Sequence, residues 1–251
     1  MKHYKLVIFF LFIIIIFIIY KFTFHEKVNY LSIGDSISCG VSPYGDIKDS
    51  FSDYFALYLK NNHRLTKYNN KFSSPDLRIT DFINQMKENK HIKDNDKLVY
   101  INQEIQKADI ITLSLGFEEL NYKINLEKNK SIDTLNNLYN YVDEIFSDYL
   151  KSIEMLRKIT LKPIILIGYY NPLSYLNKQD YQKIEKLFRY IEINFNKLAK
   201  IKNIYYIGIY DVFKEKSYYI PSNLDYHPSL EGQNYISNEL IKLIETKKIL
   251  K

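Results

Sequence analysis

Two short polar segments contain a serine and a histidine that could act as a nucleophile and its base. Ser36 follows Gly34 and Asp35 at the end of an apolar run. His227 lies two residues after Asp225. A serine hydroxyl is a weak nucleophile until a base takes its proton, and a carboxylate can orient the histidine that does so. These residues predict acyl transfer, with Ser36 as nucleophile, His227 as base and Asp225 as the acid that orients the ring.

Each segment alone also has a structural interpretation. Gly-Asp-Ser is typical of a turn that ends a strand, and Asp-x-His-Pro is typical of a helix cap. The other histidines flank the first apolar run of the chain or lie in polar stretches: His3, His25, His63 and His91. His227 alone lies between an acid and a proline. The joint placement of the two segments therefore favours the catalytic interpretation.

Apolar runs and helical spacing alternate from residue 26 onward. Four runs predict buried strands: Val28–Ile33, Ile110–Leu115, Ile164–Tyr169 and Ile204–Tyr210. Local patterns, chiefly apolar residues at three-four spacing, predict helices over 51–60, 78–87, 135–156, 181–198 and 236–243. Continuous apolar strands are typical of a parallel sheet that is covered on both faces, and repeated strand–helix units predict a doubly wound α/β domain. The Asn- and Lys-rich stretch 122–130 predicts a surface loop.

Ligands of such a sheet bind beyond the carboxyl ends of its strands. The backbone N–H of Ser36 would point toward an oxyanion formed at its own hydroxyl. Gly116 follows the second predicted strand, and Tyr170 and Asn171 follow the third. We therefore expect Gly116, Tyr170 and Asn171 to line the substrate cleft.

The first 25 residues form a segment of their own. Leu6–Tyr20 is fifteen residues long and carries no charge, with Lys5 before it and Lys21 after it. A membrane-spanning helix needs about 20 apolar residues, and Phe22 and Phe24 extend the run. No small-x-small cleavage site follows, so the segment predicts an uncleaved signal anchor, a transmembrane helix that precedes the domain. A cleaved signal peptide and a buried core helix are the alternatives.

The remaining residues, 26–251, have the length of one domain. Lysines before the apolar run favour a domain outside the cytoplasm, anchored to the membrane, or secreted if the signal is cleaved. Three of the 35 basic residues and none of the 29 acidic ones precede residue 26, so the net charge of +6 falls to +3 in the domain. No basic stripe remains that would bind nucleic acid. The single cysteine excludes a multi-cysteine zinc site, and no metal or cofactor is predicted.

Three segments resemble the sequence blocks of the SGNH (GDSL-type) hydrolase family. Residues 33–41 resemble the first block, residues 108–116 the lead into the third, and residues 225–232 the last. The resemblance runs over most of residues 28–245 and puts the serine and histidine named above in the nucleophile and base positions. It implies a three-layer α/β/α fold with a five-stranded parallel sheet, of the flavodoxin-like kind. It also implies metal-free hydrolysis of esters on lipids, carbohydrates or small acyl compounds.

The third block departs from the family pattern. It usually reads Gly-x-Asn-Asp, and its Asn donates a hydrogen bond to the oxyanion. In residues 116–119 the aligned position is Glu118, and an ionised carboxylate accepts hydrogen bonds but cannot donate them. A Glu118 that is protonated beside Glu119, or Asn121 three residues on, would restore a donor.

The second and last blocks depart as well. The stretch 72–81 contains no glycine, and Asp76 stands where the family has one, so only its backbone N–H could serve as a donor. Asp225 precedes His227 by two residues, where the family more often spaces the pair by three.

The sequence thus predicts a serine esterase or lipase-like hydrolase that acts on carboxylic esters. Its substrates would be O-acylated glycans, lipids or small acyl compounds, and its oxyanion site would involve Ser36, Asp76 and Glu118. Its one membrane contact would be the N-terminal helix. The alternative is a catalytically weakened protein of the same fold that binds envelope glycans or a partner protein through the same cleft.

Overall fold

The computed structural model describes residues 12–13, 26–126, 134–171, 178–221 and 225–250. Its centre is a sheet of five strands in the order β2-β1-β5-β6-β7, and every neighbouring pair is parallel. The strands are β1 (Val28–Gly34), β2 (Leu65–Asn69), β5 (Ile110–Ser114), β6 (Ile164–Ile167) and β7 (Ile204–Ile207). The five-stranded parallel sheet expected from the resemblance is confirmed.

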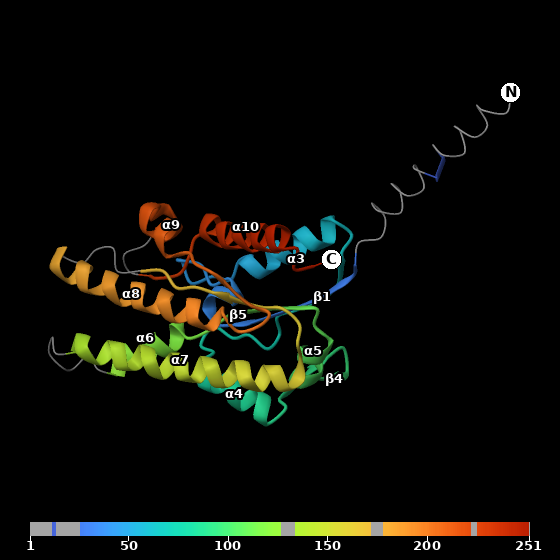
Figure 1. Ribbon diagram of the computed structural model, residues 1–251, viewed down its shortest axis with the longest axis horizontal. Coiled ribbons are helices and arrows are strands. Elements are labelled where there is room, and N and C mark those ends of the chain that lie inside the picture. The colour runs from blue at the N-terminus through green and yellow to red at the C-terminus, as the bar shows by residue number, and fades with distance from the viewer. Residues whose placement is uncertain (1–11, 14–25, 127–133, 172–177, 222–224, 251) are drawn as a thin grey trace.

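Helices cover both faces of this sheet, which gives three layers (Figure 1). On one face lie α3 (Phe51–Asn61) and α10 (Leu230–Lys247), which pack against each other. The other face is covered by α4 (Ile79–Lys87), α5 (Ile101–Lys107), α6 (Phe117–Leu126), α7 (Thr134–Ile159) and α8 (Lys178–Leu198). The helices predicted from apolar spacing are therefore confirmed.

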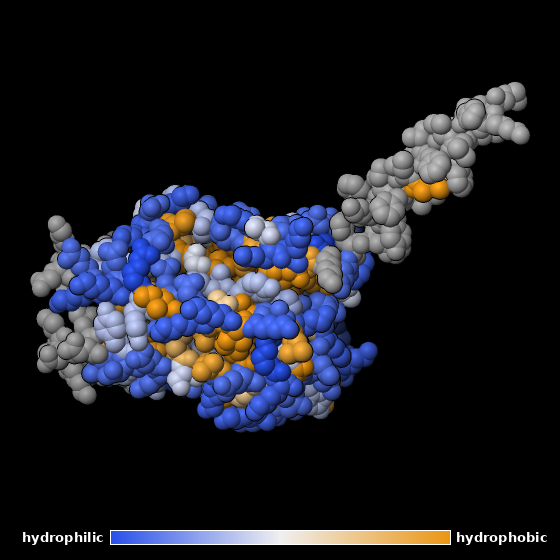
Figure 2. All heavy atoms as spheres, in the orientation of Figure 1, coloured by the Kyte–Doolittle hydropathy of each residue, from blue (hydrophilic) through white to orange (hydrophobic). Residues whose placement is uncertain are grey.

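Successive side chains of each strand point to opposite faces of the sheet and form two separate hydrophobic cores. Leu31 and Ile33 of β1 enter the core under α4 to α8, whereas Val28 and Tyr30 enter the core under α3 and α10. All four side chains are almost completely buried. On the face shown in Figure 2, hydrophilic residues cover the outer helices, and hydrophobic residues gather in a band between the upper and lower helices. Burial on both faces explains why the strands lack polar alternation.

The edge strand β2 and the end of α6 differ from the sequence prediction. β2 has largely exposed or half-buried residues, so its sequence carries no continuous apolar run. The composition of 122–130 predicts a loop, but α6 continues through this stretch to Leu126; residues 127–130 lie outside the described part of the chain. A hairpin of β3 (His91–Asp94) and β4 (Lys97–Tyr100) lies outside the main sheet.

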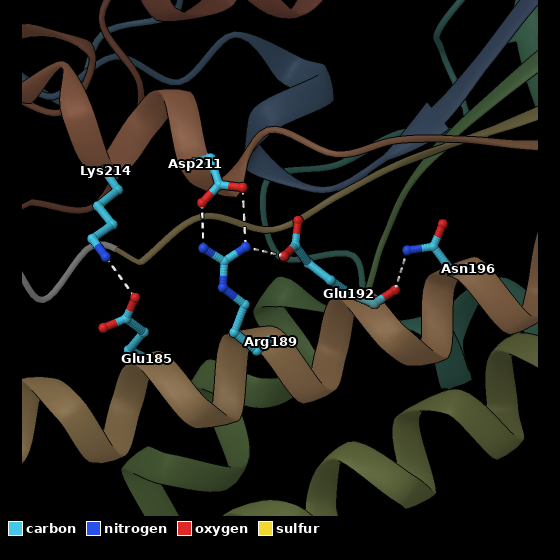
Figure 3. Close-up of polar contacts among 6 residues, drawn as sticks. All are labelled: Glu185, Arg189, Glu192, Asn196, Asp211 and Lys214. Atoms are coloured by element: carbon cyan, nitrogen blue, oxygen red, sulfur yellow. Dashed lines mark hydrogen bonds and ion pairs between the residues drawn. The ribbon is translucent and has the colours of Figure 1, made fainter.

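A short helix, α9 (Tyr210–Glu215), links the end of β7 to the segment before α10. Arg189 of α8 binds both carboxylate oxygens of Asp211, and Lys214 binds Glu185 at 2.5 Å (Figure 3). The same Arg189 contacts Glu192 at 2.8 Å on its own helix. The ion pairs hold α9 against α8. They fix the start of the segment that leads through the short 3-10 helix η1 (Ser217–Tyr219) toward His227.

The predicted N-terminal anchor lies outside the described residues, except for Phe12 and Ile13, which are exposed. Within the ranges that the structure describes, no helix is both long enough and apolar enough to cross a lipid bilayer.

Candidate active site

Ser36 lies at the carboxyl end of β1, where the chain turns into the short helix α2 (Ser36–Cys39). Asp35 caps this helix, because its Oδ1 accepts a hydrogen bond from the backbone N–H of Ile37 at 3.2 Å. Its own N–H donates to the carbonyl of Ser114 on β5 at 2.9 Å. Gly34 has no room for a side chain, since a Cβ there would lie 2.5 Å from the Ser114 carbonyl oxygen. The turn that presents Ser36 is therefore tied to two central strands.

The pairing of β1 with β5 brings residues 116–119 beside Ser36. Gly34 pairs with Ser114, so the segments that follow the two strands leave the sheet side by side. α6 begins at Phe117, and Glu118 is its second residue. The Ser36 hydroxyl donates a hydrogen bond to Glu118 Oε1 at 3.0 Å. The structure thus brings together Ser36 and the glutamate that the sequence resemblance aligns with the family's asparagine.

A tyrosine completes this group. The Tyr226 hydroxyl donates to the same Oε1 of Glu118 at 2.9 Å. The Tyr226 carbonyl accepts a hydrogen bond from the Tyr170 hydroxyl at 2.7 Å. Burial, followed by the nearby Glu118 carboxylate, raises the pKa of Tyr226, so its hydroxyl stays protonated at neutral pH. One carboxylate oxygen therefore accepts from both the Ser36 hydroxyl and the Tyr226 phenol.

The predicted base and its acid are in contact. His227 Nδ1 lies 2.7 Å from Asp225 Oδ1, and the backbone N–H of His227 donates to the same oxygen at 2.7 Å. The pair is only partly exposed, and the His227 ring lies 4.4 Å from the Tyr226 ring, measured between centroids. No hydrogen bond joins Ser36 to His227 in the described residues. The two-residue spacing of the acid and base is therefore compatible with a direct contact between them.

Asp35 is a second carboxyl group behind the nucleophile. It is completely buried, and its Oδ2 has no hydrogen-bond partner within the described chain. Burial first, and the Glu118 carboxylate second, raise the pKa of Asp35 well above its ordinary value. The cap carboxyl and Glu118 therefore repel each other whenever both are ionised.

The second block lies against β1 through two serines rather than through Asp76. Ser73 Oγ accepts from the Gly34 N–H at 3.0 Å, and the Ser74 N–H donates to the Gly34 carbonyl at 3.3 Å. Asp76 is exposed, and its carboxylate accepts from Ser74 Oγ at 3.0 Å. The role of the Asp76 N–H at an oxyanion stays a prediction.

The three residues expected to line the cleft, Gly116, Tyr170 and Asn171, are all buried. Tyr170 is fully buried, so it acts through its hydrogen bond to Tyr226 rather than as an exposed wall, and Asn171 is also buried. Gly116 has a positive φ of 90°, and a Cβ there would lie 2.0 Å from the Tyr169 hydroxyl. Phe117 packs against the Tyr170 and Tyr226 rings at centroid distances of 5.5 and 5.3 Å. These aromatic contacts fix the start of α6 and the loop that holds His227.

Tyr226 is the site residue that sequence reasoning missed. It lies between Asp225 and His227, and its position there was the one available signal. Among the described residues, no cluster of three or more His, Cys, Asp or Glu side chains could hold a metal ion.

Comparison with known proteins identifies both fold and family. In the search of solved structures, the lipase Lip_vut3 from a goat rumen metagenome is 20% identical, with a TM-score of 0.68 over 86% of this chain and 97% of that chain. A catalytic mutant of Axe2, an acetylxylan esterase from Geobacillus stearothermophilus, is 16% identical, with a TM-score of 0.62 over 87% and 94%. The esterase EstA from Pseudoalteromonas sp. is 13% identical, with a TM-score of 0.52 over 88% and 99%.

These identities are low enough that the structures show the fold alone. A search of curated protein sequences finds no significant match. The sequence profile described as GDSL-like Lipase/Acylhydrolase, in contrast, matches residues 30–240, a range that includes Ser36, Glu118 and His227. The chain therefore belongs to the GDSL-like lipase/acylhydrolase family of hydrolases.

Proposed function

We propose that the protein hydrolyses carboxylic esters with Ser36 as nucleophile, His227 as general base and Asp225 as the orienting acid. The observation that carries this proposal is the 2.7 Å contact between His227 Nδ1 and Asp225 Oδ1. A histidine that donates from Nδ1 has its lone pair on Nε2, which is the tautomer needed to take a proton from a serine. Ser36 lies in the segment that resembles the first block of the family, at the carboxyl end of a central strand.

The reaction proceeds in two halves. In the first, a bond forms between Ser36 Oγ and the acyl carbon, the carbonyl electrons move to oxygen, and His227 Nε2 takes the hydroxyl proton. The bond to the leaving alkoxide then breaks, and the imidazolium returns the proton to it, which leaves an acyl-enzyme. In the second half, water attacks the acyl-enzyme with His227 again as base, and Ser36 is released with its proton. The backbone N–H groups of Ser36 and Asp76 are the proposed oxyanion donors.

The proposed substrate is an O-acylated envelope glycan or a lipid ester. Two facts support this class: lipases and acetylxylan esterases share the fold, and a long apolar run precedes the domain. We further propose that residues 1–25 anchor the protein in a membrane, with residues 26–251 outside the cytoplasm. The charge pattern around Leu6–Tyr20 supports that orientation.

The test compares the full chain with its Ser36→Ala variant. We expect hydrolysis of short acyl esters and covalent labelling by a fluorophosphonate, both lost in the variant. Equal melting temperatures of the two proteins control for folding. If the full chain is neither labelled nor more active than Ser36→Ala, the proposed esterase function is wrong.

A second candidate function is supported by the direction of one hydrogen bond. The Ser36 hydroxyl donates to Glu118, and in the described residues it makes no hydrogen bond to His227. A protein in which this arrangement is permanent would bind glycans or a partner through the same cleft without cleaving esters. Unchanged glycan binding in Ser36→Ala, together with no labelling of the full chain, would favour this function over hydrolysis.

A further inference from the structure

We propose that the Tyr226 hydroxyl is an oxyanion donor of this enzyme, and that Glu118 occupies the oxyanion position until substrate displaces it. The phenol would then do the work of the asparagine amide that the third block lacks. This inference rests on the proposed ester hydrolysis at Ser36, and it adds a catalytic residue to that reaction.

The shared acceptor oxygen locates the position. Glu118 Oε1 lies 3.0 Å from the Ser36 hydroxyl and 2.9 Å from the Tyr226 hydroxyl. In a tetrahedral intermediate, the oxyanion and Ser36 Oγ are bonded to the same carbon. The oxyanion therefore lies close to Ser36 Oγ, as Glu118 Oε1 does in this structure. Oxyanion donors act from about 2.7–3.1 Å. A negatively charged oxygen beside Ser36 is thus already within donor range of Tyr226.

Tyr226 is held from three sides, as a preorganised donor must be. The Tyr170 hydroxyl binds its carbonyl at 2.7 Å, and Tyr170 is itself fully buried. The Phe117 ring lies 5.3 Å from the Tyr226 ring, and the His227 ring lies 4.4 Å away from it. A donor held before substrate arrives needs no reorganisation during the reaction.

The protonation state of Tyr226 suits this role. Burial and the neighbouring Glu118 carboxylate raise the pKa of Tyr226, so it is a donor throughout the neutral range. Ionised Glu118, in contrast, only accepts, and as long as it occupies the position it competes with the substrate oxygen.

Glu118 can leave without breaking the fold. It is only half-buried, it lies on the first turn of α6, and its long side chain has several rotamers. The titratable groups that interact with its charge are Asp35, Tyr170 and Tyr226.

The first experiment uses the full chain and the variant Tyr226→Phe, which removes one oxygen atom. A matched control is Tyr58→Phe, since Tyr58 also donates to a glutamate, Glu245 at 2.7 Å, but lies on α3 away from Ser36. With a short acyl ester we expect kcat of Tyr226→Phe to fall by about 10²–10³-fold, with KM within a few-fold. Binding of a phenylboronic acid, which forms a tetrahedral adduct on Ser36, should weaken at least tenfold. Tyr58→Phe should leave both values unchanged.

The second experiment separates catalysis from structure by repeating Tyr226→Phe in a Glu118→Ala background. There the hydrogen bond from Tyr226 to Glu118 no longer exists. A loss of kcat in this background therefore measures the interaction of the Tyr226 hydroxyl with the oxyanion in the transition state. We expect a loss of at least tenfold.

The possible outcomes distinguish the role of Tyr226 from the proposed ester hydrolysis at Ser36. If Ser36-dependent hydrolysis is present and Tyr226→Phe behaves like Tyr58→Phe, the role of Tyr226 is wrong and the esterase stands. If Tyr226→Phe lowers kcat only when Glu118 is present, the tyrosine is a positioning residue and the inference is overturned. If the full chain shows no Ser36-dependent hydrolysis at all, the proposed function fails and the inference fails with it.

Discussion

At the scale of single residues, the sign of the charge beside Ser36 separates this chain from its family pattern. An asparagine can donate to an oxyanion, whereas an ionised Glu118 would repel one, and here Glu118 also accepts a hydrogen bond from the Ser36 hydroxyl at 3.0 Å. A Ser36 hydroxyl that points toward Glu118 is not presenting its proton to His227. In the proposed mechanism, the same carboxylate would weaken both the nucleophile and the oxyanion site.

Replacing Glu118 by asparagine should restore activity. We expect Glu118→Asn to raise kcat/KM for a short acyl ester by up to about 100-fold, because the variant removes the repulsive charge and supplies an amide donor. Initial rates at matched enzyme concentration, normalised by fluorophosphonate-labelled Ser36, provide the measurement. An unchanged or lower rate would mean that Glu118 is not at the oxyanion site.

The buried cap residue Asp35 should make folding stability depend on pH. Its pKa is raised from 3.8, chiefly by burial, so the folded state favours the protonated form. Stability associated with this group is fully present below the unfolded pKa and is lost as pH rises through the folded pKa. Asp35→Asn keeps an oxygen for Ile37 and cannot ionise, so it lacks this loss.

The melting temperature of Asp35→Asn relative to the native chain should therefore rise with pH above about pH 4. Its second amide atom replaces an oxygen that has no hydrogen-bond partner in the described residues, and this cost is the same at every pH. Melting curves recorded at several pH values measure the difference. A constant offset between the two proteins would contradict the prediction.

The sequence indicated the candidate nucleophile and base, but not the residues that contact them. Gly-Asp-Ser and Asp-x-His-Pro stood out through their joint placement after predicted strands and before predicted helices, since each segment alone also has a structural interpretation. Tyr226 did not stand out, since the chain contains 24 tyrosines. Its bond to Glu118 joins residues 108 positions apart, and only the register of β1 with β5 and the path of the loop after η1 bring them together.

At the scale of elements, the start of α6 is the most constrained point of the site. Gly116 has a φ of 90°, where side chains other than glycine are strained, and its neighbour is the Tyr169 hydroxyl, which binds the Leu115 carbonyl at 2.8 Å. Gly116→Ala adds both strain and a collision. It should cost at least about 2 kcal/mol and lower the melting temperature by roughly 4–8 °C.

Gly45→Ala is the matched control for this prediction. Gly45 also has a positive φ, of 80°, but no atom lies within 4 Å of the position that an alanine methyl group would take there. Its variant therefore reports backbone strain without collision, and should lower the melting temperature less than Gly116→Ala does. Equal effects from the two variants would show that the contact with Tyr169 does not limit the start of α6.

The elements that could be predicted are those with buried faces. Four strands carry continuous apolar runs because helices cover the sheet on both sides, and α7, α8 and α10 carry regular apolar spacing because one side of each is buried. β2 could not be found in this way, since it lies at the edge and exposes much of its length. The extension of α6 to Leu126 was missed because its Asn and Lys residues resemble loop composition.

At the scale of the whole molecule, every buried core residue among those described belongs to the part of the chain after residue 26. The two cores run from Val28 to Ile244 and enclose both faces of the sheet. The site residues lie within the same range. The described core and the candidate site therefore both lie within residues 26–251, as the interpretation of residues 1–25 as a separate segment requires.

This separation predicts how a shortened chain should behave. A protein of residues 26–251 should fold with the melting temperature of the full chain and keep its Ser36-dependent esterase rate, because it loses no core residue and only three of 35 basic residues.

The full chain should sediment with membranes when expressed in bacteria, while the shortened chain stays in the supernatant. Lys5→Glu, which places a negative charge beside the apolar run, tests orientation through the accessibility of the domain to added protease. A full chain that remains in the supernatant would rule out the anchor, and a shortened chain that cannot fold would mean that residues 1–25 contribute to the domain itself.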